Sequence, residues 1–237
     1  MSRAGSALLA AGLGLLVALP ALASGQLQVR PTLAELRPGT TASRLTLANP
    51  GDRPLAVQVR VYAWQQVDGE DRLSETDRVL VTPPIATLPA GGEQVLRVVR
   101  TGPAPQGTDA TYRVVVDQIP EAAQNNAVSL RMRLVLPLFD RAAGALPAQL
   151  TCQIQGTAGA KLRCDNTGGR AAQLGASILS DTTGHNLPLT EGLFGYVLPG
   201  RYRLWALPAK AASLGPDLRL DTHLDGTALS LPVPRHP

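Results

Sequence analysis

Residues 128–136 read VSLRMRLVL, and their apolar side chains fall on alternate positions. The apolar row consists of Val128, Leu130, Met132, Leu134 and Leu136. Strict alternation over this length predicts a β-strand that buries one face and exposes the other. The apolar face can pack inside its own domain, or an edge strand can offer it to a partner chain. The alternation by itself leaves both interpretations open.

Similar segments precede this stretch and are separated from one another by turn-forming residues. Alternating strand patterns cover residues 44–48, 56–64, 94–99 and 111–116. Turn signals follow at 49–52, 68–71 and 91–92, where Asn, Asp, Gly and Pro cluster. Pro83 and Pro84 interrupt a further segment, and proline cannot donate a ladder hydrogen bond, so they belong at a sheet edge or a strand switch. About seven short strands before residue 140 predict an immunoglobulin-like sandwich.

A second block of strand signals follows a break at residues 142–147. It comprises residues 149–155, 161–165, 171–179, 201–207 and 218–221. The spacing again predicts a small sandwich. The sequence therefore predicts an all-β chain of two immunoglobulin-like domains, over residues 24–143 and 144–237.

The first 23 residues have the pattern of a signal peptide. Arg3 is followed by an apolar run from Ala7 to Val17, and the small residues Ala21 and Ala23 fit a cleavage site. We therefore expect export of the mature chain. No later stretch has the roughly eighteen apolar residues of a membrane span, so stable membrane insertion is not expected.

The two cysteines of the chain, Cys152 and Cys164, lie in the second block. An exported compartment permits a disulfide between them, which would join the first hairpin of the second domain. Metal binding is the alternative, and the absence of a nearby histidine in the sequence disfavours it. We expect one structural disulfide and no metal.

The sequence contains few signs of an enzyme. His185, His223 and His236 lie far apart, without the spacing of metal ligands. The chain also lacks a nucleophile elbow, a phosphate-binding loop and a dinucleotide fingerprint. The net charge of +4 is spread without blocks of Lys or Arg, which disfavours a nucleic-acid partner. We expect neither catalysis nor a cofactor.

A series of short motifs, in order along the chain, resembles the periplasmic pilus-assembly chaperones of the chaperone–usher pathway. The motifs are VRPT (29–32), LTLANPG (45–51), TPPI (82–85), LPAG (88–91), QVLR (94–97), QIP (118–120), LPLF (136–139), NTGG (166–169) and YVLPG (196–200). The resemblance is greatest to the archaic branch, whose clients resemble spore coat U-type subunits.

This resemblance implies two immunoglobulin-like domains in a boomerang arrangement, with a cleft between them. It also implies a periplasmic chaperone that binds pilus subunits and delivers them to an outer-membrane usher. The last strand of the first domain would complete a subunit that lacks its final strand. Here the inserted side chains would be the five of the apolar row in residues 128–136.

The resemblance further implies two basic cleft residues that grip the carboxylate at the client's C-terminus. This sequence departs from that pattern, because the expected arginine falls near Leu33 and the expected lysine near Pro137. The nearest basic residues are Arg30, Arg131 and Arg133, and we favour Arg30 and Arg133. The alternative is that all three are ordinary exposed arginines of a sandwich.

A function of another class is an exported structural subunit or adhesin built from immunoglobulin-like domains. Such a subunit should lack a last strand and carry a free N-terminal extension. The strand pattern instead predicts a full set of strands, with few residues between the signal peptide and the first one. The chaperone is therefore the favoured interpretation.

Overall fold

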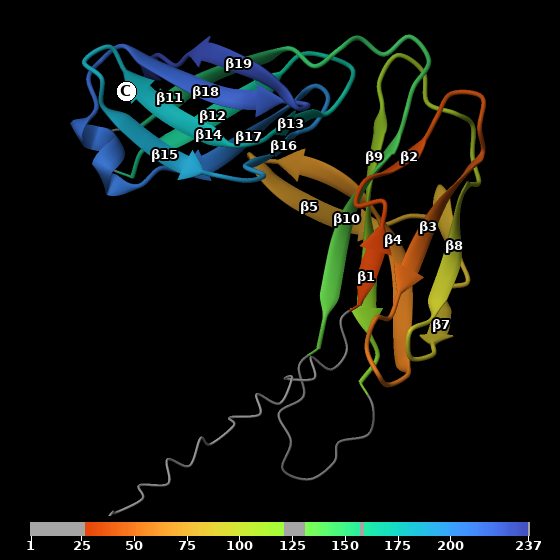
Figure 1. Ribbon diagram of the computed structural model, residues 1–237. Coiled ribbons are helices and arrows are strands. Elements are labelled where there is room, and N and C mark those ends of the chain that lie inside the picture. Colours follow the sequence, from red (N-terminus) through yellow and green to blue (C-terminus); the bar gives the residue numbers. More distant parts are fainter. Residues whose placement is uncertain (1–26, 121–130, 157–158, 237) are drawn as a thin grey trace, which may run out of the picture.

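The computed structural model describes residues 27–120, 131–156 and 159–236. The strands up to Asp140 form two sheets, and the strands from Leu150 onward form two more. Figure 1 shows the two halves meeting at an angle near one end of the first. The all-β fold of two sandwich domains agrees with the prediction. The proposed signal peptide lies outside the described residues, in which no helix has the length and apolar character to cross a bilayer.

The first domain packs a four-stranded sheet against a larger one. The smaller sheet has the order β1 (Gln28–Arg30), β3 (Ala42–Ala48), β8 (Glu93–Arg100) and β6 (Val79–Thr82). The larger has the order β2 (Ala34–Leu36), β10 (Arg133–Asp140), β9 (Ala110–Gln118), β4 (Leu55–Val67) and β5 (Glu70–Glu75), and β7 (Ile85–Leu88) also pairs with β4. Leucine and valine side chains from both sheets fill the core between them.

The chain changes sheet at the two prolines singled out in the sequence. β6 ends at Thr82 in the smaller sheet, and β7 begins at Ile85 in the larger one. Pro83 and Pro84 lie between the two strands, so neither has to donate a ladder hydrogen bond. The sequence left a sheet edge and a strand switch open for these prolines, and the structure shows the strand switch.

The second domain is also a sandwich of two sheets. One has the order β17 (Arg201–Ala206), β12 (Lys161–Asn166), β11 (Leu150–Gln155) and β20 (Arg235–His236). The other has the order β15 (Asn186–Thr190), β14 (Ser177–Asp181), β18 (Leu218–Leu224), β13 (Ala172–Leu174) and β16 (Gly195–Val197), with β19 (Thr227–Pro232) paired to β18. A short 3-10 helix, η1, covers Ala209–Ser213.

Cys152 and Cys164 lie directly opposite each other on β11 and β12 and form a disulfide. The predicted bridge is therefore present, and it excludes the metal site. The segment 171–179, predicted as one strand, is instead divided into β13 and β14. The break falls at Gly175, whose N–H donates to the carbonyl of His223 on β18.

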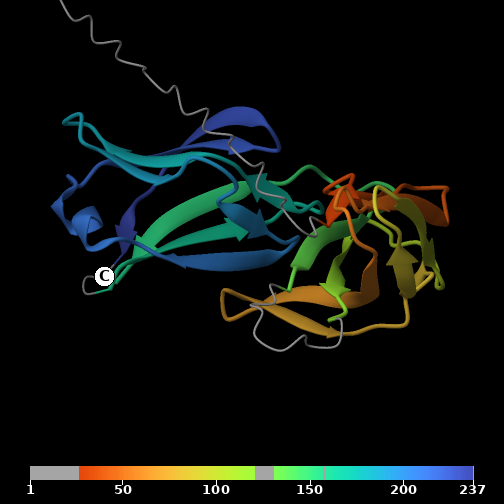
Figure 2. The same ribbon diagram turned by 60° about the horizontal axis from the view of Figure 1, so that its bottom comes forward.

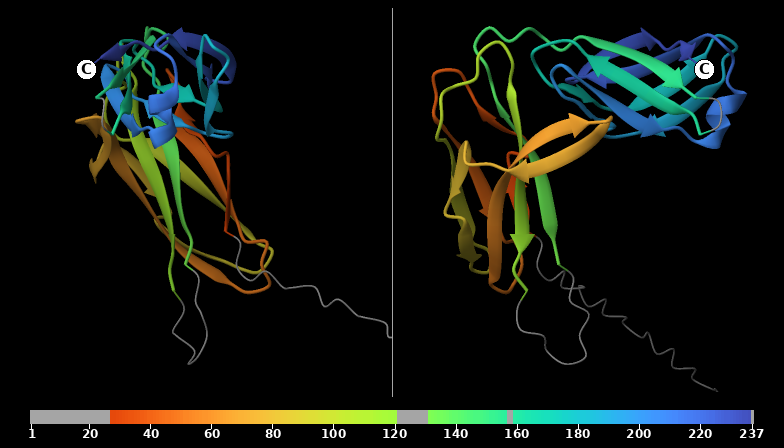
Figure 3. Two further views of the ribbon diagram at one scale, coloured as in Figure 1. Left: turned by 90° about the vertical axis from the view of Figure 1, so that its left-hand side faces the viewer. Right: turned by 180° about the vertical axis from the view of Figure 1, so that it is seen from behind.

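The two domains share a small aromatic cluster of their own. It consists of Trp64, Phe139, Ala171, Tyr196 and Leu198, with Leu33 packed against it. Trp64 and Phe139 come from the first domain, and Tyr196 comes from β16 of the second. Figures 2 and 3 show the hairpin of β4 and β5 reaching from the first domain to the second. The junction is therefore packed rather than a bare linker.

Candidate functional site

One edge of β10 is only partly covered. On one side β10 pairs antiparallel with β9 along its whole length, from Arg133 to Asp140. On the other side β2 pairs with it only from Leu138 to Asp140. In the described part of the chain, no strand pairs with that side between Arg133 and Pro137. The backbone groups of such an edge are available to a strand from another chain.

The apolar row passes from the buried core to a half-exposed end. Leu136 is 6% exposed and Leu138 is fully buried, and both belong to the core of the first domain. Met132 and Leu134 are only partly buried where they pack against that core. Val128 and Leu130 lie outside the described residues. Leu136 is therefore a core residue in this structure, whereas Met132 and Leu134 keep apolar surface beside the open edge.

Arg113 lies on the opposite face of this sheet, next to the domain junction. It occupies the position on β9 directly across from Pro137 on β10. Its guanidinium carbon is 3.5 Å from the centre of the Trp64 ring and 5.5 Å from that of Tyr196. Both aromatic faces attract a cation. Side chains from both domains therefore hold the Arg113 head group.

The charge of Arg113 is not neutralised locally. Within the described residues, no carboxylate lies within ion-pair distance of its guanidinium and no acceptor forms a hydrogen bond with it. Burial lowers the pKa of Arg113, while the attraction of Asp71 raises it in part. Arginine keeps its proton well above neutral pH even so. A partly buried, unpaired guanidinium of this kind is suited to bind a carboxylate.

A second charged group lies on the same face, farther from the junction. Asp117 on β9 accepts hydrogen bonds from Arg60, at 2.6 Å, and from Arg133. Burial alone would raise the pKa of Asp117, but these two hydrogen bonds outweigh it and hold the pKa below its ordinary value. One carboxylate between two arginines leaves this group with a net positive charge.

The structure does not bring the predicted basic residues together. Arg30 belongs to β1 in the other sheet, where it pairs with Glu93 at 2.5 Å. Arg131 is exposed just before β10, and Arg133 is paired with Asp117. Leu33 packs on the aromatic cluster at the junction. Of the two positions at which the resemblance implies a basic residue, Leu33 and Pro137, only Pro137 faces an arginine on the neighbouring strand. That arginine is Arg113.

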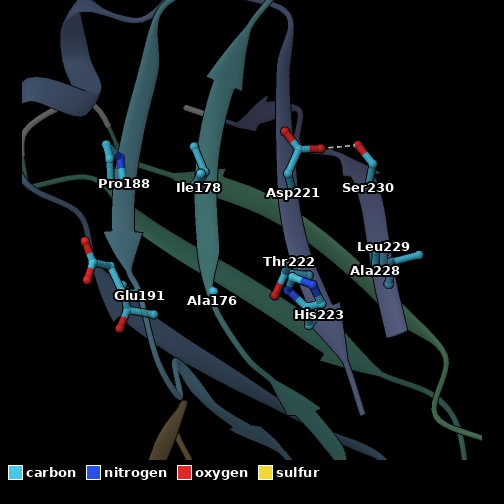
Figure 4. Close-up of a pocket in the computed structure, with 11 residues that line it drawn as sticks. Ala176, Ile178, Pro188, Glu191, Asp221, Thr222, His223, Ala228, Leu229 and Ser230 are labelled. Atoms are coloured by element: carbon cyan, nitrogen blue, oxygen red, sulfur yellow. Dashed lines mark hydrogen bonds between the residues drawn. The ribbon is translucent and has the colours of Figure 1, made fainter. Parts of the chain in front are cut away.

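A further hollow lies elsewhere, on the outer face of the second domain. It has a volume of about 610 Å³ and is lined from β14, β15, β18 and β19. Figure 4 shows Ile178, Pro188, Asp221 and His223 among its lining residues. No three His, Cys, Asp or Glu side chains come together for a metal ion anywhere in the described ranges. Neither the free β10 edge nor Arg113 borders this hollow.

Comparison with known proteins places these features in a family. The model for pili and flagellar-assembly chaperones, PapD N-terminal domain, matches residues 26–145. No curated protein sequence matches the chain. Solved structures of the same fold do match it over nearly their whole length.

One similar structure is the CsuC–CsuE complex of a chaperone with a tip adhesion subunit, from the archaic Csu pili of Acinetobacter baumannii. It shows 22% identity, a TM-score of 0.69, and coverage of 90% of this chain and 100% of that chain. The SafB chaperone of Salmonella enterica, solved with the SafA pilin, shows 21% identity, a TM-score of 0.64, and coverage of 87% and 95%. The E. coli chaperone DraB shows 22% identity, a TM-score of 0.60, and coverage of 90% and 98%. At these identities the likeness concerns the fold.

The family match decides between the functions considered from the sequence. It favours the chaperone over a structural subunit or adhesin, and it agrees with the prediction that the chain is not an enzyme. The matched residues span the whole first sandwich, including the open edge of β10 and Arg113. With half of its length matched by the family model, the chain belongs to the PapD-type pilus-assembly chaperones.

Proposed function

We propose that this chaperone holds spore coat U-like pilus subunits by adding its β10 edge to a subunit that lacks a strand. The observation that carries this proposal is the open edge of β10 between Arg133 and Pro137, with the partly buried apolar side chains of Met132 and Leu134 beside it. Strand addition supplies main-chain hydrogen bonds for affinity and alternate side chains for specificity. The inserted side chains are Val128, Leu130, Met132 and Leu134.

The extent of the proposed donor row follows from burial. Leu136 already packs in the chaperone's own core and is not available to a subunit without unpacking. Each fully buried side chain of this kind contributes ~1.5–3 kcal/mol. The four remaining positions therefore offer substantial binding energy even after the entropic cost of association.

Arg113 is the anchor that we propose for the carboxylate at the subunit's C-terminus. β10 runs toward the domain junction, where the Arg113 guanidinium lies over the Trp64 ring and near the Tyr196 ring. A subunit strand whose C-terminal end reaches Arg113 therefore runs parallel to β10 along the open edge. We favour Arg113 over Arg30, which lies in the other sheet, and over Arg133, which is already paired. Arg131 is exposed before the start of β10, at the end away from the junction.

The setting of this activity is the periplasm. We propose that residues 1–23 direct export and that an outer-membrane usher receives the subunit from the chaperone. The CsuC–CsuE and SafB–SafA structures, which pair chaperones of this fold with a tip adhesion subunit and a pilin, support subunits as the partner class. We also propose a domain boundary at residue 143, in the connection between β10 and β11.

The test is co-purification from the periplasm with a tagged subunit encoded beside the chaperone. Leu130→Arg combined with Met132→Arg is expected to abolish co-purification, because arginine cannot enter an apolar groove without a partner charge. Leu80→Arg combined with Val95→Arg is the matched control, because both side chains are exposed on the smaller sheet. Normal co-purification of the Leu130 and Met132 variant would rule out the donor strand.

A further inference from the structure

A single side chain, Gln66, joins the two domains through both ends of its amide. Its Nε2 donates to the carbonyl of Tyr196 at 2.8 Å, and its Oε1 accepts from the N–H of Leu198 at 2.9 Å. Nε2 also donates to Oδ1 of Asp71 on the neighbouring strand, at 3.0 Å. Gln66 is only 3% exposed. Its polar atoms are therefore buried and satisfied.

The geometry imitates strand pairing. A carbonyl and the N–H two residues further on are the groups that one residue of an adjacent parallel strand would bind. The Gln66 amide supplies the matching donor and acceptor from a side chain. A carboxylate or an aliphatic chain of similar size cannot do both. The amide therefore specifies one position of β16 relative to β4.

The tip of the same hairpin fits closely against β17. The carbonyl of Gly69 accepts from the N–H of Leu204 at 3.0 Å and from Nη1 of Arg203 at 2.6 Å. A β-carbon at Gly69 would lie 2.5 Å from Cγ of Leu204. Figure 3 shows this hairpin lying against the second domain. The hairpin thus holds the second domain at two separate points, Gln66 and Gly69.

The strand held by Gln66 carries a ring that contacts Arg113. The Tyr196 ring lies 5.4 Å from Trp64 and 5.8 Å from Phe139, measured between centroids, and 5.5 Å from the Arg113 guanidinium. Tyr196 is therefore the part of the second domain that bounds the Arg113 head group. Moving the Tyr196 backbone would open that side of the guanidinium to solvent.

From these contacts we infer that Gln66 is a positioning residue for Arg113: it holds Tyr196 across the domain boundary and so fixes the guanidinium against the Trp64 and Tyr196 rings. The importance of this positioning for subunit capture rests on the proposed function, in which Arg113 is the anchor. The effect of Gln66 on Arg113 itself can be measured in the free chaperone.

The test measures the accessibility of Arg113 in the intact mature protein, without any subunit. Phenylglyoxal, which modifies arginine, is the probe, and mass spectrometry of peptides gives the rate at each arginine. Gln66→Met is expected to speed modification of Arg113 about tenfold, since leaving buried polar groups unpaired shifts a local equilibrium by at least that factor. Gln65→Met is the matched control, because Gln65 is the exposed neighbour on the same strand.

The modification rate at Arg100 distinguishes local opening at the domain junction from general unfolding. It is buried in an ion pair with Asp140 inside the first domain, so its rate should stay unchanged in both variants. If Gln66→Met also exposes Arg100, Gln66→Asn takes its place, because the shorter amide cannot bind both of its partners in the second domain, Tyr196 and Leu198. An unchanged rate at Arg113, in a Gln66 variant whose Arg100 stays protected, would overturn the inference.

Subunit binding provides a separate readout. If the Gln66 variant exposes Arg113 and also loses the subunit, positioning and anchoring both stand. If it exposes Arg113 while subunit retention stays normal, the positioning role stands and Arg113 is not the anchor. The two claims therefore fail in different measurements.

Discussion

Arg113 and Pro137 lie directly opposite each other on β9 and β10. Directly opposed residues of an antiparallel pair point to the same face of the sheet, with their β-carbons about 5 Å apart. Position 137 is where the family resemblance implies a lysine, and a proline occupies it here. The neighbouring strand thus carries a cation on the same face of the sheet, with its guanidinium over the Trp64 ring.

Replacing Arg113 by Gln should weaken subunit binding without weakening the fold. Loss of a charge-assisted hydrogen bond is expected to reduce affinity at least about tenfold. The unfolding temperature should change little, because the cost of partly burying the Arg113 charge offsets its attraction to the Trp64 and Tyr196 rings. Binding is measured with a purified subunit, and unfolding by circular dichroism. Arg44→Gln, on the outer face of the smaller sheet, is the control. Unchanged affinity in the Arg113 variant would exclude the anchor.

Leu136 and Leu134 should separate folding from binding, although they are only two residues apart. Leu136→Ala is expected to cost ~2–5 kcal/mol of unfolding free energy, because it leaves a cavity in the core. Leu134→Ala should cost less stability and more subunit affinity, since its side chain is only partly buried. Denaturant unfolding gives the stability of both variants, and a binding assay gives their affinity for the subunit. A larger loss of affinity in Leu136→Ala than in Leu134→Ala would contradict the proposed donor row.

The buried pair of Arg100 and Asp140 links the two sheets of the first domain. Arg100 donates to both carboxylate oxygens, at 2.6 and 2.5 Å, and both side chains are almost fully buried. Arg100→Met alone should cost ~3–5 kcal/mol, because it leaves Asp140 charged and buried. Arg100→Met with Asp140→Leu should recover most of that loss. Urea unfolding of the two variants measures the difference, and equal losses would contradict the expectation.

The disulfide of Cys152 and Cys164 should contribute measurably to the second domain. Closing a loop of this size stabilises a fold by ~2–3 kcal/mol in the chain-entropy account. The double Ser variant is therefore expected to unfold at lower denaturant concentration. Mass spectrometry of the periplasmic protein should find both cysteines oxidised, and two free thiols there would contradict the pairing.

Asp181 on β14 should make the second domain sensitive to acid. Its carboxylate accepts from the N–H of Gly215, the hydroxyl of Thr183 and the N–H of His185. These hydrogen bonds, that of Gly215 first, lower the pKa of Asp181 well below its ordinary value of 3.8. Because the folded-state pKa is depressed, the contribution of Asp181 to stability is complete above pH 3.8 and falls as the pH drops below it.

The measurement for Asp181 is unfolding between pH 6 and pH 2, with Asp181→Asn as the comparison. The variant should be less stable at neutral pH and should lose less stability on acidification. Asp221→Asn is the control, since Asp221 lies on the exposed face of β18. Parallel curves for the wild type and the Asp181 variant would contradict the assignment.

The longer strands could be predicted from the sequence, because alternating apolar residues indicate which face of a strand is buried. β4 and β9 each place valines on the core side at every second position, which is why their extents were close to those observed. The strand switch at Pro83 followed from the missing N–H. The short strands β15, β16 and β19 were missed, because three to six residues are too few to establish an alternation and prolines interrupt β15 and end β19.

The basic residues near the domain junction were harder to predict from the sequence, as Arg30 illustrates. Alternation tells which face of a strand a side chain occupies, but it does not tell which sheet the strand joins. β1 pairs with β3, so Arg30 faces away from the junction and meets Glu93. Arg113 required the register between two strands far apart in sequence, and that register follows only from the assembled sheet.

The parallel contact of β2 with β10 limits what the open edge can accept. β2 begins its pairing at Leu138, so five residues, Arg133 to Pro137, remain free ahead of it. At ~3.3 Å per residue, this is a length of about 17 Å. A guest strand advancing toward Arg113 meets the start of β2 and can go no farther. In the proposed function, β2 therefore sets the point along β10 at which an added subunit strand must end.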